Sequence, residues 1–494
     1  MSLRSKAKRW TYLVHRWLGI GGCVLMALWF ASGMVMLFIG YPKLTPGERL
    51  AGLPALQGDP ALRPVSSLPA ELRQAPERLA LTTVRGEPAY VVRGGAHPGA
   101  WSAHTGKALA TINAAGAARA AAQFSNAPAT GAAVPIDEDR WTHSRGLDGH
   151  RPLYRVDVGG AQAGVVYVSS RTGEVVLDAP QYQQRWNHVG AWLHWLYPLR
   201  MKSVDPVWTW TVIVLSALCT MAAMSGVLVG VWRWRFRGRY RSGAKTPYVE
   251  PWMRWHHMLG LATSAFVFLW IFSGLMSMNP GKVFSSPHAA VDEQRYRGAS
   301  AAADPAVDDP SRLLWALARD GMRPVELQWR RVAGTVFAVA LDGSGTVRVV
   351  VPHGAASGVS AALPGALLRD AAGTLVDAPV RSFSVLQAPD AYFYARAPEA
   401  MNGALVRRFP VARVQFADPE QTRVYLDLAT GDPLLVMGRR ERIGRWLFNF
   451  LHSWDLPPML QAGAGRTGVL IVLSLGGLAL CVTALVIGWR RLRR

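Results

Sequence analysis

Cysteine and acidic residues are scarce in this chain. Among its 494 residues there are 3 cysteines, and 54 Lys and Arg residues outnumber 32 Asp and Glu residues. The three cysteines (Cys23, Cys219 and Cys481) all fall inside long apolar runs. The sequence therefore indicates neither a disulfide framework nor a thiolate metal site, and its polar segments must fold on ordinary hydrophobic cores.

Long apolar runs are the main feature that the sequence does contain. A helix that spans a bilayer needs about 20 apolar residues, and four runs reach that length, over residues 17–40, 207–232, 255–278 and 467–489. The first run is longer than the apolar core of a cleaved signal peptide, so we expect it to stay as a span. With 494 residues the chain is too long for one domain.

Positive charge gathers in three short segments that flank these runs, and Glu250 is the exceptional acid among them. The basic residues are Arg4, Lys6, Lys8 and Arg9, then Arg233, Arg235, Arg237, Arg239, Arg241 and Lys245, then Arg490, Arg491, Arg493 and Arg494. The positive-inside rule places all three segments in the cytoplasm. Much of the net charge of +22 then reflects topology and attraction to the membrane surface, and no nucleic-acid partner is expected.

This topology divides the chain into seven parts. They are residues 1–40 (cytoplasmic N-terminus and first span), 41–206 (first outer domain with an interfacial helix), 207–232 (second span), 233–254 (basic cytoplasmic loop), 255–278 (third span), 279–466 (second outer domain with an interfacial helix) and 467–494 (fourth span and basic tail).

The two halves of the chain repeat each other around their histidines. His15-Arg16-Trp17-Leu18-Gly19 opens the first span, and His256-His257-Met258-Leu259-Gly260 opens the third, 241 positions later. The same offset relates Trp29 to Trp270 and Ser32-Gly33 to Ser273-Gly274. An offset of 258 relates His194 to His452, Ser225 to Thr483 and Gly230 to Gly488.

Paired histidines from matched helices are the arrangement that a haem iron needs for its two axial ligands. Ionisable residues at membrane depth are costly and usually functional. We therefore predict that His15 pairs with His256 on a cytoplasmic-side haem, and that His194 pairs with His452 on an outer one. Aromatic residues surround His194 and His452, so an interfacial aromatic belt is the alternative interpretation for that pair.

Small residues share a helix face with these ligands. His15 and Gly33 are 18 residues apart, which is five full turns, and His256 and Gly274 repeat the spacing. Gly33 and Gly274 are expected to make room beside the outer cofactor. Gly230 and Gly488 would do so beside the cytoplasmic one. Close helix packing is the alternative explanation for all of them.

The remaining histidines are expected to be neighbours or surface residues. His257 and His188 have no histidine at the matching repeat positions, and each is predicted to lie beside a ligand rather than to bind iron. The others lie in polar outer segments and are read as surface residues: His97, His104, His143, His150, His288 and His353.

Arginines near the ligands are candidates to bind the haem propionates, because guanidinium groups pair well with carboxylates. Arg16 and Arg254 would act at the cytoplasmic haem, and Arg200 or Lys202 at the outer one. For Arg16 and Arg254, anchoring at the cytoplasmic face is an equally good interpretation.

The outer segments are predicted to be rich in β-strands. Runs such as 154–158 and 165–168 alternate apolar and polar residues. Thr-Gly pairs at 105–106, 172–173 and 430–431 indicate turns in which glycine supplies a positive φ. The Ala-rich stretch 114–122 is expected to be a helix packed on a sheet, and stretches 41–76 and 285–310 are expected to be loops.

Together these features resemble the PepSY-associated transmembrane family. The resemblance rests on the His-x-x-x-Gly openings, the Ser-Gly pairs, the Tyr-Arg-Val-Asp…Arg-Thr-Gly-Glu hairpin and Leu451-His452-Ser453-Trp454-Asp455-Leu456-Pro457. It implies a four-helix core built from two repeated halves in the bacterial inner membrane, each half with an external PepSY-like, β-rich α+β insertion in the periplasm. Some members of the family are dihaem reductases of ferric siderophores, which implies two haem b groups.

The expected function is electron transfer from the cytoplasmic side or the quinone pool to a periplasmic acceptor, with ferric siderophore as the first candidate. No flavin or nicotinamide motif is present, so the donor is expected to be a quinol, a free reduced flavin or a reductase partner. One alternative is a non-enzymatic PepSY module that binds or regulates a periplasmic partner. Another is a transporter, although few charges lie within the spans.

Overall fold

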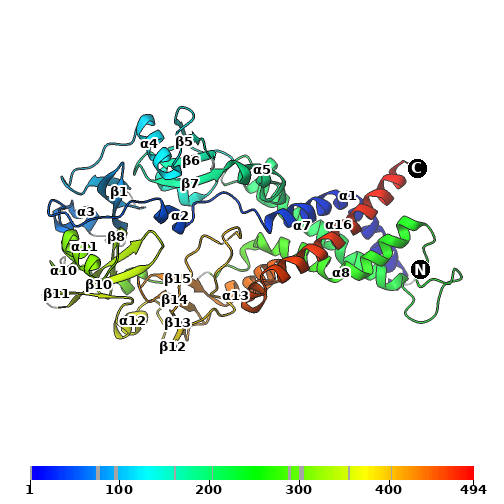
Figure 1. Ribbon diagram of the computed structural model, residues 1–494. Helices are drawn as coiled ribbons and strands as arrows, with labels where there is room; N and C mark the ends of the chain where they lie inside the picture. Colours follow the sequence, from blue (N-terminus) through cyan, green and yellow to red (C-terminus); the bar gives the residue numbers. More distant parts are fainter. Residues whose placement is uncertain are drawn as a thin grey trace.

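A computed structural model of the chain describes residues 3–493, except for residues 74–77, 94–97, 161–162, 203, 287–290, 300–304, 354–355 and 402. Its described part holds four helices long and apolar enough to cross a membrane, which are α1 (Leu3–Met36), α7 (Pro206–Arg233), α8 (Pro251–Ser277) and α16 (Ala464–Leu492). They form one elongated bundle (Figure 1). This confirms the four predicted spans, although α1 begins well before its apolar run.

The bundle has two different ends. Both chain termini and the basic loop between α7 and α8 lie at one end, which we name the basic end, and all of the β-structure lies at the other, the domain end (Figure 1). Two of the spans begin at side-chain caps: Asp205 accepts a hydrogen bond from the Trp208 amide, and Glu250 accepts one from the Met253 amide. A proline follows each cap, where its fixed φ and missing N–H suit a helix start.

The helices pack in a ring. Each helix contacts two neighbours, in the cyclic order α1, α7, α8, α16. Helices α1 and α8 therefore lie on one diagonal of the bundle, and α7 and α16 lie on the other. Because the sequence repeat relates α1 to α8 and α7 to α16, the repeat corresponds to a pseudo-twofold axis along the middle of the bundle.

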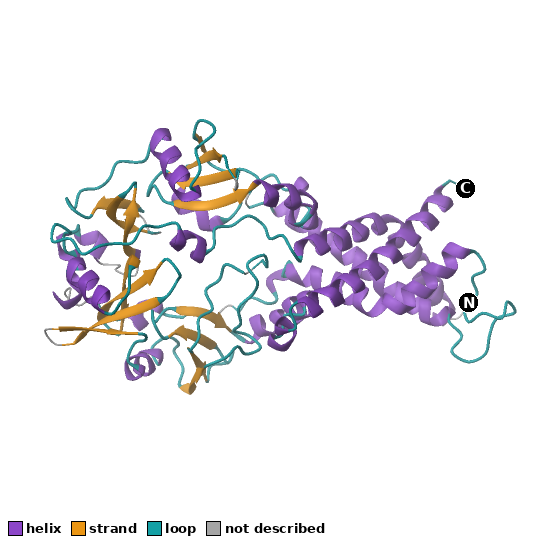
Figure 2. Cartoon of the chain, in the orientation of Figure 1, coloured by secondary structure: helices purple, strands orange, loops and turns teal. Residues whose placement is uncertain are grey.

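The domain end contains three antiparallel sheets (Figure 2). One has seven strands in the order β11-β10-β9-β8-β1-β2-β3. Its strands are β1 (Leu79–Val84), β2 (Glu87–Val92), β3 (Gly99–Ser102), β8 (Pro324–Val332), β9 (Thr335–Asp342), β10 (Val347–His353) and β11 (Ala356–Ser360). The four-stranded sheets comprise β4 (Val134–Ile136), β5 (Leu153–Val158), β6 (Gly164–Ser169) and β7 (Val175–Pro180), and β12 (Val380–Leu386), β13 (Val411–Phe416), β14 (Arg423–Asp427) and β15 (Pro433–Met437). The β-rich insertions are thus confirmed.

The seven-stranded sheet joins the two outer segments. Strand β1 of the first segment pairs with β8 of the second, with Leu81 opposite Leu327 and Thr82 opposite Glu326. Division of the chain into two separate insertions did not anticipate this ladder. Since β1 and β8 are central and antiparallel, the pseudo-twofold relation of the bundle extends into this sheet, which lies farthest from the membrane helices (Figure 1).

Short helices connect and cover these sheets. They are α2 (Pro46–Ala51), η1 (Val65–Ser67), α3 (Ala70–Arg73), α4 (Ala114–Ser125), η3 (Arg145–His150), α5 (Gln181–Val189), α6 (Ala191–His194), η4 (Tyr197–Leu199), η5 (Pro280–Lys282), α9 (Glu293–Arg297), α10 (Pro305–Asp308), α11 (Pro310–Arg319), α12 (Gly365–Ala372), α13 (Arg439–Arg445), the π-helical turn η6 (Trp446–Phe450), α14 (Leu451–Ser453) and α15 (Pro457–Gln461). Helix α4 confirms the predicted Ala-rich helix, since Ala117 and Ala121 are buried with Val156 of β5. The stretches expected to be loops contain α2, α3, α9 and α10, so that expectation was wrong in part.

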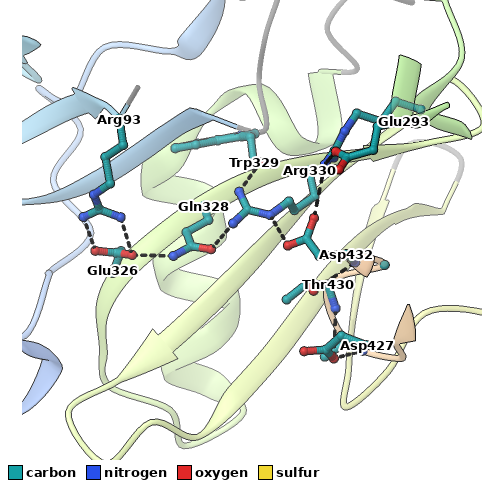
Figure 3. A network of polar contacts seen from close by, with 12 residues as sticks. Arg93, Glu293, Glu326, Gln328, Trp329, Arg330, Asp427, Thr430 and Asp432 are labelled. Atoms are coloured by element: carbon teal, nitrogen blue, oxygen red, sulfur yellow. Dashed lines mark hydrogen bonds and ion pairs between the residues drawn. The ribbon is translucent and has the colours of Figure 1, made fainter. Parts of the chain in front are cut away.

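Two of the predicted Thr-Gly turns connect the four-stranded sheets to the seven-stranded one. Gly173 and Gly431 have φ of 78° and 70°, as a turn of this kind requires. The acid that follows each glycine bonds to arginines of the seven-stranded sheet: Glu174 accepts from Arg93, and Asp432 accepts from Arg330. Both halves of the chain therefore use the same turn to dock one sheet against another, and Figure 3 shows the contact of the second half, between Arg330 and Asp432.

Glu326 lies at the centre of this polar network. Its side chain is 0 % exposed and accepts hydrogen bonds from Arg49 at 2.6 Å and Arg93 at 2.7 Å. Burial alone would raise the pKa of the Glu326 carboxyl, but the guanidinium groups of Arg93 and Arg49 lower that pKa well below its ordinary value. The ion pairs therefore stabilise the fold above the ordinary carboxyl pKa, and this contribution is lost as the pH falls below that range.

We predict that Glu326→Gln lowers the free energy of unfolding by about 3–5 kcal/mol, because it leaves Arg49 without its anion and removes one of the two carboxylates that Arg93 contacts. Thermal melting of the full chain in detergent measures the change. Glu293→Gln is the matched control, since the Glu293 side chain is half exposed and Arg297 keeps Asp432 as a partner, so its loss should cost about 1 kcal/mol or less. Equal melting temperatures for both variants would contradict this account of the network.

Candidate cofactor sites between paired histidines

His15 of α1 and His256 of α8 meet on the diagonal of the bundle near its basic end. The centres of their rings are 6.2 Å apart, and the ring planes are inclined by 31°. The two side chains come from helices that are not neighbours in the ring, so they approach each other across the bundle centre. The structure therefore brings together the first pair that the repeat predicts.

Hydrogen bonds fix the tautomer of both rings. Nδ1 of His15 lies 3.2 Å from the Ala222 carbonyl oxygen, which can only accept, so Nδ1 carries the proton. Nδ1 of His256 lies 2.9 Å from Oγ1 of Thr483, and that hydroxyl already donates to the Leu480 carbonyl. The Thr483 oxygen therefore accepts from His256, and Nε2 of each ring keeps its lone pair.

His194 and His452 form a second pair at the domain end. Their ring centres are 6.1 Å apart, with the planes inclined by 66°. The chain reaches them differently in the two halves. Helix α5 ends at Gly190 before α6 carries His194, whereas the π-helical turn η6 leads into α14, which carries His452. In both halves the histidine side chain points toward the middle of the bundle, near the start of the following membrane span.

The Ser-Gly pairs of α1 and α8 hold these two rings. Nδ1 of His194 lies 3.0 Å from Oγ of Ser32, and Nδ1 of His452 lies 3.1 Å from Oγ of Ser273. Ser32 donates its own proton to the Leu28 carbonyl, and Ser273 donates to the Trp270 carbonyl. Each serine oxygen therefore accepts from a histidine Nδ1–H, which again leaves Nε2 free.

The ring separations fit two imidazoles bound to one metal ion. With a metal–nitrogen bond of about 2 Å and a ring centre about 1 Å beyond the nitrogen, two imidazoles on opposite sides of one ion have centres about 6 Å apart. Metal-binding histidines commonly donate the other ring N–H to an oxygen acceptor, which is the arrangement of all four residues.

The chemistry of the donor set favours haem over a bare ion. In the part of the chain that the structure describes, no group of three or more His, Cys, Asp or Glu side chains is placed to hold a metal ion. Zinc sites use at least three protein ligands, whereas haem iron takes four nitrogens from the porphyrin and needs only two from the protein. Paired histidines therefore fit a haem.

A cavity of about 420 Å³ opens at the domain-end pair. His194 and His452 line it together with Trp29, Trp270 and many apolar side chains. The size and the mainly apolar lining are those of a cofactor or ligand site. Two arginines also line it, Arg396 and Arg466. Arg396 pairs with Asp455, and Arg466 donates from Nε to the Trp454 carbonyl oxygen at 3.0 Å.

Two of the four glycines that were expected to make room beside a cofactor lie against a predicted ligand, and two do not. A Cβ on Gly33 would lie 3.5 Å from Cε1 of His194, and one on Gly274 would lie 3.7 Å from Cε1 of His452, so both glycines adjoin the predicted ligands. A Cβ on Gly230 would instead meet Leu261, and one on Gly488 would meet Ile20. These two glycines permit helix packing at the basic end.

Gly226 of α7 is the glycine that lies against His15, and sequence reasoning missed it. A Cβ there would lie 2.8 Å from Cε1 and 3.1 Å from Nδ1 of the His15 ring. The repeat gave no signal for this residue, because Ala484 occupies the matching position in α16.

His257 and His188 use both ring nitrogens within the protein. Nδ1 of His257 bonds to Thr246 and its Nε2 to the Gly230 carbonyl oxygen, at 2.7 and 2.9 Å. In His188, Nδ1 bonds to the Gln184 carbonyl oxygen and Nε2 lies 3.1 Å from Arg140. Neither residue offers a free lone pair to a cofactor, as expected for neighbours of the ligands.

The arginines that were predicted to bind the haem propionates lie in different environments. Arg16 and Arg254 are exposed at the basic end, and neither makes a side-chain hydrogen bond or ion pair with another described residue. The Arg200 guanidinium stacks on Tyr197 and Trp208, and its Nε donates to the Lys202 carbonyl. Arg396 and Arg466 are the arginines that line the cavity. They lie outside the repeated motifs, which is why sequence reasoning missed them.

The histidines of the outer segments are less exposed than expected. His104 pairs with Asp59, His143 pairs with Glu138, and His150 is largely buried, which lowers its pKa. His97 and His288 lie outside the described residues, as does the side chain of His353.

A comparison with known families assigns the chain. The family model for the PepSY-associated TM region matches residues 12–357, which is more than half of the chain and includes three of the four spans. The protein belongs to this family. No curated protein matches the chain closely enough to count as a relative. Family membership agrees with the observed fold of membrane-length helices and β-rich insertions.

We predict that Gly226→Ala weakens cofactor binding at the His15/His256 pair by about tenfold or more, because the new methyl group displaces the His15 ring from its hydrogen bond to Ala222. Titration of haem into the cofactor-free protein in detergent measures the affinity. Gly21→Ala is the control, since a Cβ there meets nothing within 4 Å. Unchanged haem affinity in Gly226→Ala would show that the His15 ring is not a ligand in this position.

Proposed function

We propose that this protein is an electron carrier of the bacterial inner membrane that holds two haem b groups and reduces an acceptor on the periplasmic side. The proposal rests on the two histidine pairs, whose ring centres are 6.2 and 6.1 Å apart and in which the Nδ1 atom of each ring is hydrogen bonded. Family membership supports a membrane protein but does not reach this function.

The residues that would hold each haem follow from the geometry. Nε2 atoms of His15 and His256 would bind one iron, and those of His194 and His452 would bind the other. Haem supplies one-electron redox chemistry when it is bound. Ala222 and Thr483 orient the first pair of rings, and Ser32 and Ser273 orient the second, so the protein fixes the ligands before the cofactor arrives.

The distance between the two histidine pairs is compatible with electron transfer across a membrane. His15 and Ser32 are 17 residues apart on α1, so a rise of about 1.5 Å per residue separates the two sites by about 25 Å along the bundle. Phe30 and Trp270 pack between the helices within this interval, with ring centres 6.1 Å apart. Their burial keeps water out of the core of the bundle.

The orientation that we propose places the basic end in the cytoplasm and the sheets in the periplasm, in accord with the positive-inside rule. The electron donor would be a quinol, a free reduced flavin or a reductase partner at the basic end or within the bilayer. We propose a ferric siderophore or another ferric chelate as the acceptor. Reduction would release iron, because ferrous iron binds hard oxygen ligands less tightly than ferric iron does.

We predict that His452→Ala loses about half of the bound haem and all reduction of an external ferric chelate, because the remaining His15/His256 pair still holds one haem. The pyridine haemochrome assay gives the haem content. Dithionite-reduced protein in vesicles, mixed with an impermeant ferric chelate, gives the reduction rate.

His188→Ala is the matched control, since His188 lies near His194 but bonds to Gln184 and Arg140 instead of a cofactor. It should keep both haems and the full rate. Full haem retention in His452→Ala would contradict the assignment. A protein without haem in any form would favour a PepSY module that binds a periplasmic partner.

A further inference from the structure

A second cavity adjoins the cavity of His194 and His452. Its volume is about 300 Å³, and it lies between the end of α8, the loop that precedes β13, and α13 with η6. Four residues line both cavities: Ser277, Arg396, Phe448 and Asn449. The two spaces are therefore contiguous at the junction between the membrane helices and the sheet β12–β15. The family assignment and the sequence motifs assign no role to this second cavity.

Arginine dominates the charged lining of the second cavity. Arg396, Arg407 and Arg445 line it, and Glu441 is the acid among its lining residues. Glu441 is already engaged, because its carboxylate accepts hydrogen bonds from the amides of Ser286 and Gly438. The cavity therefore presents more positive than negative charge to a ligand.

The three arginines have different partners. Arg396 and Arg445 both contact the fully buried carboxylate of Asp455, at 2.9 and 3.1 Å. Arg407 has no carboxylate partner among the described residues. Its guanidinium stacks on the Phe393 ring at 4.9 Å and donates from Nη1 to the carbonyls of Val406 and Leu434. A guanidinium that is held in place without an anion is a ready site for one.

Phe448 separates this cavity from the proposed ligand His452. The centres of the two rings are 5.5 Å apart, and Phe448 lines both cavities. A molecule in the second cavity would thus lie one aromatic side chain away from His452.

We propose that this second cavity is the acceptor site, and that it binds a small anionic ferric chelate through Arg407, with Arg396 and Arg445 beside it. The inference rests on the proposed electron-transfer function. One electron passes from the reduced protein to the ferric ion, which becomes ferrous, and the net charge of the chelate becomes one unit more negative. No covalent bond forms or breaks in the chain, and no proton is required.

Binding is tested first, without electron transfer. Gallium(III) citrate, an anionic chelate that is not reduced, is titrated onto the oxidised full-length protein, and binding is followed by calorimetry. Arg407→Gln should weaken binding about tenfold, because a charge-assisted hydrogen bond is lost. Arg381→Gln is the control, since Arg381 is exposed on β12 and lies outside the cavity. The haem bands should be unchanged in both variants.

Kinetics with ferric citrate supply the second readout. Arg407→Gln should raise the KM for ferric citrate about tenfold and leave kcat unchanged. The wild type and Arg407→Gln should reduce a neutral ferric trihydroxamate equally well. Equal gallium citrate affinity in the wild type and Arg407→Gln would overturn the proposal. So would an equal loss in Arg381→Gln, or altered haem bands in Arg407→Gln, which would assign Arg407 to the haem.

Failure of this site and failure of the proposed function are distinguishable. If the protein contains no haem but binds gallium citrate through Arg407, the anion site stands and the proposed electron-transfer function is wrong. If the wild type and Arg407→Gln reduce ferric citrate with the same KM, the proposed electron-transfer function stands and the proposed acceptor site is wrong.

Discussion

Two pairs of imidazole rings, with centres 6.2 and 6.1 Å apart between the helices of one bundle, are the feature on which the rest of this structure depends. Each of the four rings donates its Nδ1–H to an oxygen of a neighbouring helix, so each Nε2 keeps a lone pair that no other described residue uses. These lone pairs are the ones that a bound haem iron would use at both ends of the bundle.

The pseudo-twofold arrangement explains how the chain achieves this pairing. His15 and His256 occupy matching positions on the diagonal helices α1 and α8, so the pseudo-twofold relation brings them together, and the same relation places β1 beside β8 in the shared sheet. The turn acids Glu174 and Asp432 connect the sheets of each half to the shared sheet. These contacts connect the two halves of the chain at the domain end of the bundle.

The two halves differ where the second cavity lies. Gly190 separates α5 from α6 in the first half, whereas the second half replaces this break with the π-helical turn η6, which carries Phe448. The loop between β12 and β13 supplies Arg396 and Arg407 and has no counterpart among the repeated motifs. A symmetric scaffold thus presents an asymmetric surface, which suits binding of one acceptor at one side of the domain-end pair.

Sequence reasoning found the spans, the β-rich insertions and the histidine pairs, because these features leave periodic or repeated signals in the chain. It recognised the repeated Ser-Gly pairs and expected their glycines beside the outer cofactor, but it gave Ser32 and Ser273 no role as hydrogen-bond acceptors. It missed the ladder between β1 and β8, since pairing between strands that are far apart in the sequence has no local signature. It also missed Gly226, Arg396 and Arg466, whose roles depend on tertiary packing rather than on a motif.

The most direct test of the central claim is the haem content of the purified protein. The absorption spectrum in detergent is recorded before and after dithionite, and the pyridine haemochrome assay gives the stoichiometry. Two histidine pairs predict sharp b-type α and Soret bands and about two haems per chain. A colourless protein, even after expression with excess haem, would contradict the account and leave the paired histidines without a cofactor.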